Sequence, residues 1–228
     1  MKAILLDIEG TIGDIKFVRE ILFPYSRSRV SQYLHDNWQT RDLQEIVASA
    51  RQVSGKTLNS SVDAARQFLE WIDEDKKITP LKSLQGLIWR EGYELGELKA
   101  HLYDDAVEAI HHWHKQSKTL YIYSSGSIAA QKLYLSYSIA GNLLSHFSGF
   151  FDTTTGPKTE SSSYEKIATV INSMPGDITF YSDTATETQA AQQAGFVAVG
   201  VDRQKSANFL DQSTNPSTIG SFTPVMSL

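Results

Sequence analysis

Short apolar runs recur along this chain, and several of them lead directly into a polar residue. The first run, Ala3–Leu6, is followed at once by Asp7. Similar runs are found at residues 119–123, 149–152, 178–181 and 196–201. Continuous apolar runs of this length are typical of strands that are buried on both faces of a parallel sheet.

Stretches with helical spacing separate these runs in the second half of the chain. Helices are predicted over residues 104–115, 127–137 with further helix to 147, 161–172 and 186–194. Strands that alternate with helices indicate an α/β fold with a doubly wound parallel sheet. After Arg203 the chain is rich in Ser, Thr, Asn and Pro, which predicts a loosely packed tail.

A long insertion separates the first two predicted strands. An ordinary crossover between parallel strands takes about thirty residues, whereas the next strand here begins only at Thr119. Helical spacing within the insertion predicts helices over residues 17–38 with an interruption at Pro24, and over 42–53, 61–72 and 79–93. We therefore expect a helical cap domain at residues 14–95, inserted into an α/β core domain formed by residues 1–13 and 96–228.

Composition narrows the possible functions. The 228 residues carry a net charge of −5 and contain no cysteine, which excludes disulfides and thiol catalysis. No basic patch suggests a nucleic-acid or anionic-membrane partner. No secretory signal or membrane-spanning apolar run is present either, so a cytoplasmic protein is expected. A monomer is the simplest expectation for its assembly.

Two acids follow the first strand. If the strand geometry continues, Asp7 and Glu9 point to the same side, and Gly10 allows the chain to turn. Carboxylates placed in this way repel each other unless a cation lies between them. Mg²⁺ fits, because it takes one or two carboxylates, keeps several waters and binds phosphate. The alternative is an ordinary turn after a strand.

Three further strand ends carry polar groups. Ser124–Ser127 precedes a helix, and such a loop either binds a phosphate at the helix N-terminus or serves only as an N-cap. Lys158 lies in a Gly-Pro loop, where it either faces an anion or stays on the surface. Asp183 ends another strand, as a metal ligand or as a helix cap. Since the carboxyl ends of parallel strands meet in one crevice, their joint occurrence favours a pocket for a phosphate ester and Mg²⁺.

These motifs resemble the haloacid dehalogenase superfamily, and within it the enolase-phosphatase (acireductone synthase) family of methionine salvage. The resemblance covers nearly the whole chain. Its residues are Asp7–Thr11, Leu22–Tyr25, Trp89–Tyr93, Gly96–Leu98, Tyr121–Ser127, Asp152–Thr154, Gly156–Lys158, Ser163–Tyr164 and Ser182–Asp183. It implies a Rossmann-like core with a mobile cap. It also implies conversion of 2,3-diketo-5-methylthiopentyl 1-phosphate to the acireductone, by enolisation and then loss of phosphate.

The resemblance also assigns roles to residues of this chain. It implies a metal site at Asp7, Glu9 and Asp183, and substrate contacts from Ser124, Ser125 and Lys158. Two positions depart from the family pattern: Gly13 stands where a polar residue or Pro is expected, and residues 184–187 contain fewer acids than expected.

Phosphate-ester chemistry suggests a division of labour among these groups. Asp7 is the best nucleophile, and Lys158 with the Ser124 loop disperses charge on the phosphate. Glu9 occupies the acid–base position of the superfamily, and the sequence leaves open whether it donates a proton, acts as a metal-linked base, or both. A generic phosphomonoesterase for another small metabolite is the alternative function.

Other candidates are weaker. His111, His112 and His114 lack an acid at ligand spacing, which favours a solvated or half-buried helix face over a metal cluster. Leu22–Tyr25 is either a lid over an apolar methylthio tail or a packed helix kink. No P-loop or dinucleotide fingerprint is present, which argues against nucleotide binding.

Overall fold

The computed structural model describes residues 3–207, 209–213 and 217–226. The chain divides into two compact units. Met1–Phe17 and Lys99–Leu228 form an α/β unit, and Val18–Leu98 forms a helical unit. In the described part of the chain, no helix combines the length and the apolar character needed to cross a membrane.

The α/β unit is organised around one sheet, which has seven strands in the described residues, in the order β3-β2-β1-β4-β5-β7-β6. The strands are β1 (Ala3–Leu6), β2 (Thr119–Tyr123), β3 (Phe147–Phe151), β4 (Ile178–Ser182), β5 (Val197–Val201), β6 (Leu210–Asp211) and β7 (Ser217–Ile219). All neighbouring strands are parallel except β6 and β7. The predicted α/β fold with a doubly wound parallel sheet is confirmed.

The register of the three central strands brings their carboxyl ends to one level. Leu6, the last residue of β1, lies opposite Ile122 of β2 and Tyr181 of β4. The chain therefore leaves all three strands at the same edge of the sheet, with Asp7 in the middle. The strand order thus creates the crevice in which α/β proteins bind ligands.

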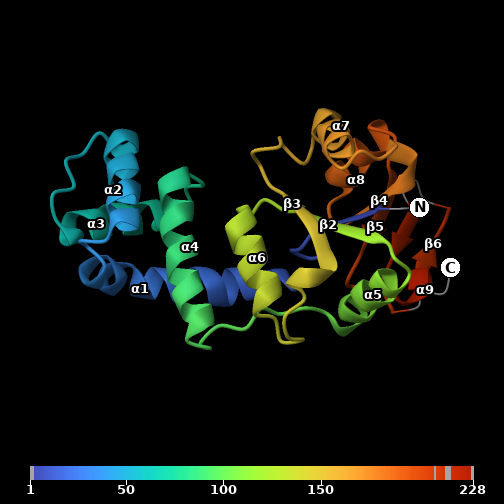
Figure 1. Ribbon diagram of the computed structural model, residues 1–228, viewed down its shortest axis with the longest axis horizontal. Coiled ribbons are helices and arrows are strands. Elements are labelled where there is room, and N and C mark those ends of the chain that lie inside the picture. The colour runs from blue at the N-terminus through green and yellow to red at the C-terminus, as the bar shows by residue number, and fades with distance from the viewer. Residues whose placement is uncertain (1–2, 208, 214–216, 227–228) are drawn as a thin grey trace. The chain divides into compact units, whose positions relative to one another are not determined.

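Helices cover both faces of this sheet (Figure 1). They are α5 (Asp104–Lys115), α6 (Ile128–Ser136), α7 (Ser161–Val170), α8 (Ala185–Gln193) and α9 (Thr223–Met226), with short 3₁₀ turns η2 (Leu144–His146) and η3 (Pro175–Asp177). Leu5 and Phe180 belong to the core beneath α7 and α8. On the other face, the Trp113 ring of α5 stacks on Tyr181, with centroids 5.5 Å apart. Neighbouring residues of a strand thus pack into the cores on opposite faces of the sheet, as the alternation of side chains requires.

The helical unit has a separate core. It contains α1 (Phe23–Asp36), α2 (Arg41–Ser54), α3 (Ser61–Asp73) and α4 (Thr79–Glu94), preceded by the π-helical segment η1 (Phe17–Leu22). Phe68 and Trp71 of α3 pack edge to face in this core, with centroids 5.4 Å apart. The C-cap of α2 is Gly55, with a left-handed φ of 68° that a residue with a side chain adopts only under strain.

The predicted interruption at Pro24 is wrong. Helical structure continues from η1 directly into α1, and Pro24 occupies the first turn of α1. Pro24 has no N–H to donate, and it stands just after the helix changes from the π-helical η1 to α1, so the lost hydrogen bond falls where the helical ladder is already altered. The Trp89 indole of α4 donates a hydrogen bond of 2.8 Å to the Leu22 carbonyl at this junction, which ties it into the helical unit.

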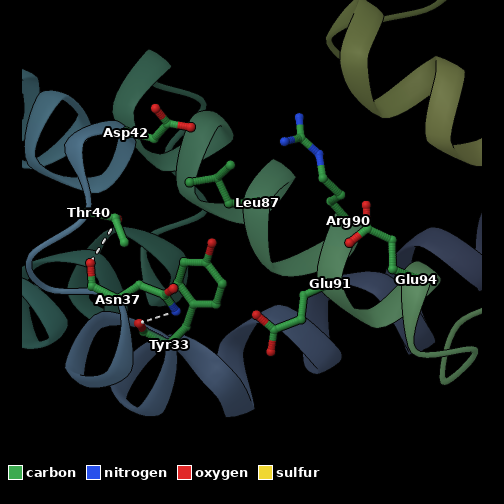
Figure 2. Close-up of a pocket in the computed structure, with 8 residues that line it drawn as sticks. All are labelled: Tyr33, Asn37, Thr40, Asp42, Leu87, Arg90, Glu91 and Glu94. Carbon is green, nitrogen blue, oxygen red and sulfur yellow. Dashed lines mark hydrogen bonds between the residues drawn. The ribbon is translucent and has the colours of Figure 1, made fainter.

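An open polar cavity of about 270 Å³ lies at the surface of the helical unit, between α1, the loop after it, the start of α2 and α4 (Figure 2). Its lining residues are Tyr33, Asn37, Thr40, Asp42, Leu87, Arg90, Glu91 and Glu94. Three of these side chains are acids and one is a guanidinium, so the cavity has an acidic balance. It contains none of the residues predicted for catalysis.

One prediction for the end of the chain needs correction. Instead of a loosely packed tail after Arg203, strands β6 and β7 extend the sheet, and Phe222 is fully buried against Trp113 and Tyr181. Ser217 and Thr218 conceal this role of β7, in which Ile219 is the fully buried apolar residue; Phe222 follows shortly after the strand.

The predicted helix running to Phe147 is also wrong. The chain after α6 makes isolated turns and the single 3₁₀ turn η2, and Phe147 already begins β3. Strand β3 therefore starts before Gly149. Phe147, at 8 % exposure, is buried as a strand residue.

Candidate active site

Asp7 lies at the centre of the candidate site. Its backbone N–H continues the ladder to the Tyr181 carbonyl at 3.0 Å, and the chain then turns sharply. The Ile8 carbonyl accepts hydrogen bonds from the N–H groups of Thr11, Ile12 and Gly13. Strand geometry thus ends with β1, and a turn, rather than strand alternation, determines where Glu9 lies.

A buried ion pair joins Asp7 to Lys158. The Lys158 Nζ lies 2.6 Å from Asp7 Oδ1 and 2.7 Å from a carboxylate oxygen of Glu187. Lys158 is 7 % exposed and Asp7 is 3 % exposed, so water screens this contact little. Burial alone would lower the pKa of Lys158, but the charges of Asp7 and Glu187 outweigh it and the pKa is raised. Lys158 therefore stays charged, facing two carboxylates.

Hydroxyl groups behind the loop hold Lys158 in place. The Tyr164 hydroxyl donates to the Lys158 carbonyl at 2.7 Å, and the Tyr123 hydroxyl donates to the Gly156 carbonyl at 2.9 Å. Ser163 donates to the Pro157 carbonyl at 2.8 Å. These donors come from β2 and α7, so the loop between β3 and α7 is fastened to α7 and to the neighbouring strand β2. Lys158 is not a surface lysine.

The hydroxyl loop after β2 contacts the second acid. Ser124, fully buried, donates from Oγ to Glu9 Oε2 at 3.0 Å and accepts the Gly126 N–H at 3.1 Å. Ser127 is the N-cap of α6 and accepts the Ala130 N–H. Ser125, between them, is exposed. The loop thus caps a helix and also faces the acids.

Asp183 approaches the turn that follows Asp7. Its N–H donates to the Thr11 hydroxyl at 3.0 Å, and that hydroxyl in turn donates to Asp7 Oδ2 at 3.3 Å. A Cβ on Gly10 would lie 2.1 Å from Asp183 Oδ2, so only glycine lets this carboxylate rest against the turn. The N-cap of α8 is Thr184, so Asp183 does not serve as the helix cap.

The acids around Asp7 affect one another electrostatically. Burial, followed by the negative charge of Asp7, raises the pKa of Glu9. The same two causes, in the same order, raise the pKa of Asp183. Burial also raises the pKa of Glu187, although Lys158 opposes that shift. The Lys158 ammonium thus lies among four carboxyl groups and contacts two of them, Asp7 and Glu187, and a cation added among the four would relieve their repulsion.

These groups fit a hard divalent ion. Carboxylate oxygens are its preferred ligands, and Mg²⁺ needs only one or two of them because it keeps several waters. In the described residues, no three His, Asp or Glu side chains are already arranged as a complete ligand set for one ion. Lys158 engages Asp7 and Ser124 engages Glu9 instead. The absence of a Cβ on Gly10 leaves room for the Asp183 carboxylate beside the turn that follows Asp7.

The structure supplies a reason for Gly13. A Cβ at this position would lie 2.1 Å from the Tyr134 hydroxyl and 2.9 Å from the His101 carbonyl oxygen, and that hydroxyl donates to that carbonyl. Any larger side chain would therefore displace α6 or the chain at His101. This departure from the family pattern follows from local packing.

The histidines of α5 lie in the α/β unit as half-buried or exposed side chains. His111 Nδ1 lies 3.2 Å from His146 Nε2, and the ring of His114 lies 4.7 Å from that of His146, centroid to centroid. His146, which lies in η2, was not among the histidines singled out from the sequence. In the described residues they do not complete a ligand set for a metal ion.

Three residues near the site were missed by sequence reasoning. Glu187 is the second partner of Lys158, and Thr11 links Asp7 to Asp183. Gln131 of α6 donates to the carbonyls of Gly126 and Phe151 and so fastens the hydroxyl loop to the end of β3. The one-turn spacing of Glu187 from Asp183 and the place of Thr11 in the Asp7–Thr11 motif were the available signals. The contacts of Glu187 with Lys158 and of Gln131 with Phe151 join separate segments, which no local pattern shows.

Comparison with known proteins identifies the relatives of this chain. Residues 1–195 match the haloacid dehalogenase-like hydrolase family. Enolase-phosphatase E1 of Alcanivorax borkumensis is 49% identical over 206 residues, which cover 90% of this chain and 91% of that protein. Enolase-phosphatase E1 of Aquifex aeolicus is 49% identical over 199 residues, covering 87% and 89%.

A solved structure supports the same relationship. The crystal structure of the UTR4 protein from Saccharomyces cerevisiae superposes with a TM-score of 0.82 at 33% identity, covering 97% of this chain and 98% of that one. Similarity at this identity and over almost the full length of both chains extends beyond the shared sheet. The chain therefore belongs to the haloacid dehalogenase-like hydrolases and, within them, to the enolase-phosphatase E1 family.

Proposed function

We propose that this protein is a Mg²⁺-dependent enolase-phosphatase of methionine salvage. It converts 2,3-diketo-5-methylthiopentyl 1-phosphate to the acireductone by enolisation followed by dephosphorylation. Relatives named enolase-phosphatase E1 at 49% identity support the reaction, and family membership implies a divalent metal ion. A cytoplasmic location and a monomeric state stay predictions.

The buried contact between Lys158 and Asp7 carries this proposal. Their 2.6 Å ion pair lies at the carboxyl end of the central strand, where open α/β sheets bind ligands. A lysine buried between two carboxylates is costly to desolvate and is a weak device for stability alone. Its charge at this place suits the binding of an anionic phosphate.

In the proposed reaction, Asp7 attacks phosphorus and forms an aspartyl phosphate, which water then hydrolyses. Lys158 holds the phosphate oxygens on which negative charge accumulates. The Thr11 hydroxyl, 3.3 Å from Asp7 Oδ2, orients the nucleophile. Two displacements at phosphorus divide one difficult step into two easier ones.

Glu9 is the proposed proton carrier. Its raised pKa, caused first by burial and then by Asp7, favours a carboxyl that holds a proton until the leaving oxygen needs it. Ser124 orients the side chain through its 3.0 Å hydrogen bond. Asp7, Glu9 and Asp183 would hold the metal ion, which when bound supplies a Lewis acid for the phosphate oxygens.

A substrate panel tests the proposal. The purified protein, stripped with EDTA and resupplied with Mg²⁺, is assayed with the diketo phosphate and with a set of sugar and acid phosphates. We expect phosphate release and acireductone absorbance from the diketo phosphate, with the highest kcat/KM of the panel. Equal or better turnover of another phosphate would leave a general phosphomonoesterase, and full activity without metal would remove the metal site.

A further inference from the structure

Arg203 reaches back to the turn that follows Asp7. Its Nε donates to the Thr11 carbonyl oxygen at 2.9 Å, and its Nη2 donates to the same oxygen. Its Nη1 donates to both carboxylate oxygens of Asp105, at 2.9 and 2.7 Å. One planar guanidinium therefore joins the end of β5, the start of α5 and the turn after β1.

Thr11, whose carbonyl Arg203 binds, links the two site acids Asp7 and Asp183. Thr11 is fully buried, donates its hydroxyl hydrogen to Asp7 and accepts the N–H of Asp183. Its hydroxyl and its carbonyl thus have separate tasks, one toward the acids and the other toward Arg203. Whatever anchors the Thr11 backbone also sets where the hydroxyl meets Asp7 and Asp183.

Arg203 is itself held from several sides. Its guanidinium carbon lies 4.2 Å from the ring centre of Tyr103 and 5.1 Å from that of Phe222, and its side chain is 14% exposed. Asp105 also accepts the Phe222 N–H at 2.7 Å. Such a fork, stacked and bidentate, depends on the planar geometry of arginine, which lysine does not reproduce.

We infer that Arg203 is a positioning residue that acts through Thr11 on Asp7 and Asp183. Its catalytic consequence rests on the proposed function, whereas its effect on the turn does not. Outer-shell contacts of this kind typically change metal affinity or activity by about 10–100-fold. Arg203 touches no reacting atom. Its removal should therefore lower kcat and metal affinity without changing which substrate the protein prefers.

The test compares Arg203→Gln and Arg203→Lys with the control Phe222→Leu. The control disturbs the same aromatic contact and the same core but leaves the hydrogen bonds to Thr11 in place. Mg²⁺ binding is measured by calorimetry, amide hydrogen exchange is followed at residues 10–13, and kcat is measured with the diketo phosphate and with p-nitrophenyl phosphate.

We expect Arg203→Gln to weaken Mg²⁺ binding and to lower kcat, each about 10-fold or more, and to speed exchange at residues 10–13. Arg203→Lys should fall between it and the unmodified protein. Phe222→Leu should lower Tm without moving metal affinity or exchange in the turn.

Arg203 would be merely structural if Arg203→Gln matched Phe222→Leu, with a lower Tm and unchanged metal affinity, kcat and exchange. If Arg203→Gln does not fold, Arg203→Lys decides: unchanged metal affinity and exchange overturn the inference, and weaker binding with faster exchange supports it. Failure of the proposed function is a separate outcome, seen when the unmodified protein does not turn over the diketo phosphate, and the exchange rates still decide the role of Arg203.

Discussion

At the scale of single residues, Lys158 is central to the proposed chemistry. Lys158 lies between Asp7 and Glu187, at 2.6 and 2.7 Å, and all three side chains are largely buried. An arriving phosphate would compete with these carboxylates for the same ammonium. In the proposed reaction the ammonium would turn from Asp7 toward the phosphate oxygens, so that one side chain would couple phosphate binding to release of the nucleophile.

The first prediction concerns this ammonium. Lys158→Met should lower kcat by about 10²-fold or more. It should also lower the free energy of unfolding by about 3–5 kcal/mol, because buried carboxylates lose their partner. Steady-state kinetics and urea unfolding measure the two effects. Adding Glu187→Gln should recover part of the stability but none of the activity, and normal kinetics in Lys158→Met would remove Lys158 from the proposed site.

The second prediction concerns the nucleophile. Asp7→Asn should abolish turnover, because a neutral amide is a poor nucleophile. Each in-line displacement inverts phosphorus, so attack by Asp7 followed by attack by water gives net retention. A substrate made chiral at phosphorus with oxygen isotopes and sulfur should therefore yield product of retained configuration. Net inversion would mean direct attack by water, with Asp7 left as a metal ligand.

At the scale of elements, the contact between the Asp7 turn and α6 leaves no room for a side chain at Gly13. Tyr134 of α6 places its hydroxyl where a Gly13 side chain would begin, and it donates to the His101 carbonyl. Helix α6 also carries Gln131, which fastens the hydroxyl loop. The same helix therefore positions two loops of the site, one through its hydroxyl and the other through its amide.

The third prediction tests this packing. Gly13→Ala should lower the free energy of unfolding by about 1–3 kcal/mol, since the new methyl group overlaps the Tyr134 hydroxyl. In a Tyr134→Phe background the cost should fall, although the His101 carbonyl still crowds the site. A double-mutant cycle by urea unfolding measures the coupling. Gly86→Ala in α4 is the control, because nothing lies within 4 Å of its Cβ, and additive effects of Gly13→Ala and Tyr134→Phe would contradict the proposed clash.

At the scale of the whole molecule, the crowded acids connect stability to pH and to metal. Glu9, Asp183 and Glu187 all have raised pKa values, with burial as the leading cause. A carboxyl with a higher pKa in the folded than in the unfolded state binds protons more tightly when folded. Its contribution to stability is therefore present below its unfolded pKa and is lost as the pH rises through the raised folded value.

The fourth prediction follows from this sign. For the metal-free protein, the contribution of Glu9 should fall as the pH rises above its ordinary value of 4.5. As the pH rises, the free energy of unfolding of the unmodified protein should therefore fall relative to that of Glu9→Gln. Saturating Mg²⁺ should reduce this fall. Urea unfolding across the pH range measures it, with the exposed Glu165→Gln as control, and a pH-independent difference would contradict a raised pKa for Glu9.

The fifth prediction concerns the enolisation step, which precedes phosphate loss in the proposed sequence. A diketone phosphonate, which cannot release phosphate, should still exchange its enolisable proton with D₂O at this protein. NMR follows the loss of the proton signal. Glu9→Gln should slow the exchange, because it removes the proposed proton carrier. Exchange no faster than in buffer would leave a plain phosphatase.

The sequence by itself determined most of the secondary structure. β1 and β2 were predicted at their observed residues, and α5 at 104–115 matches the structure. Such predictions succeed because apolar runs and helical spacing are local signals, read within a few residues. They fail where an element depends on a distant partner, as in β7, whose three residues, Ser217–Ile219, are too few to give a periodic signal and which forms by pairing with β5.

The sequence also pointed to Asp7, Ser124, Lys158 and Asp183 as strand-end groups, and their catalytic roles stay predictions. Only the tertiary structure decided which atoms meet. The Lys158–Asp7 pair joins segments 151 residues apart, and the Arg203–Thr11 bonds join segments 192 residues apart. Contacts over such separations depend on sheet register, strand order and the turn after each strand. No local pattern contains these, because each is fixed by the packing of the whole α/β unit.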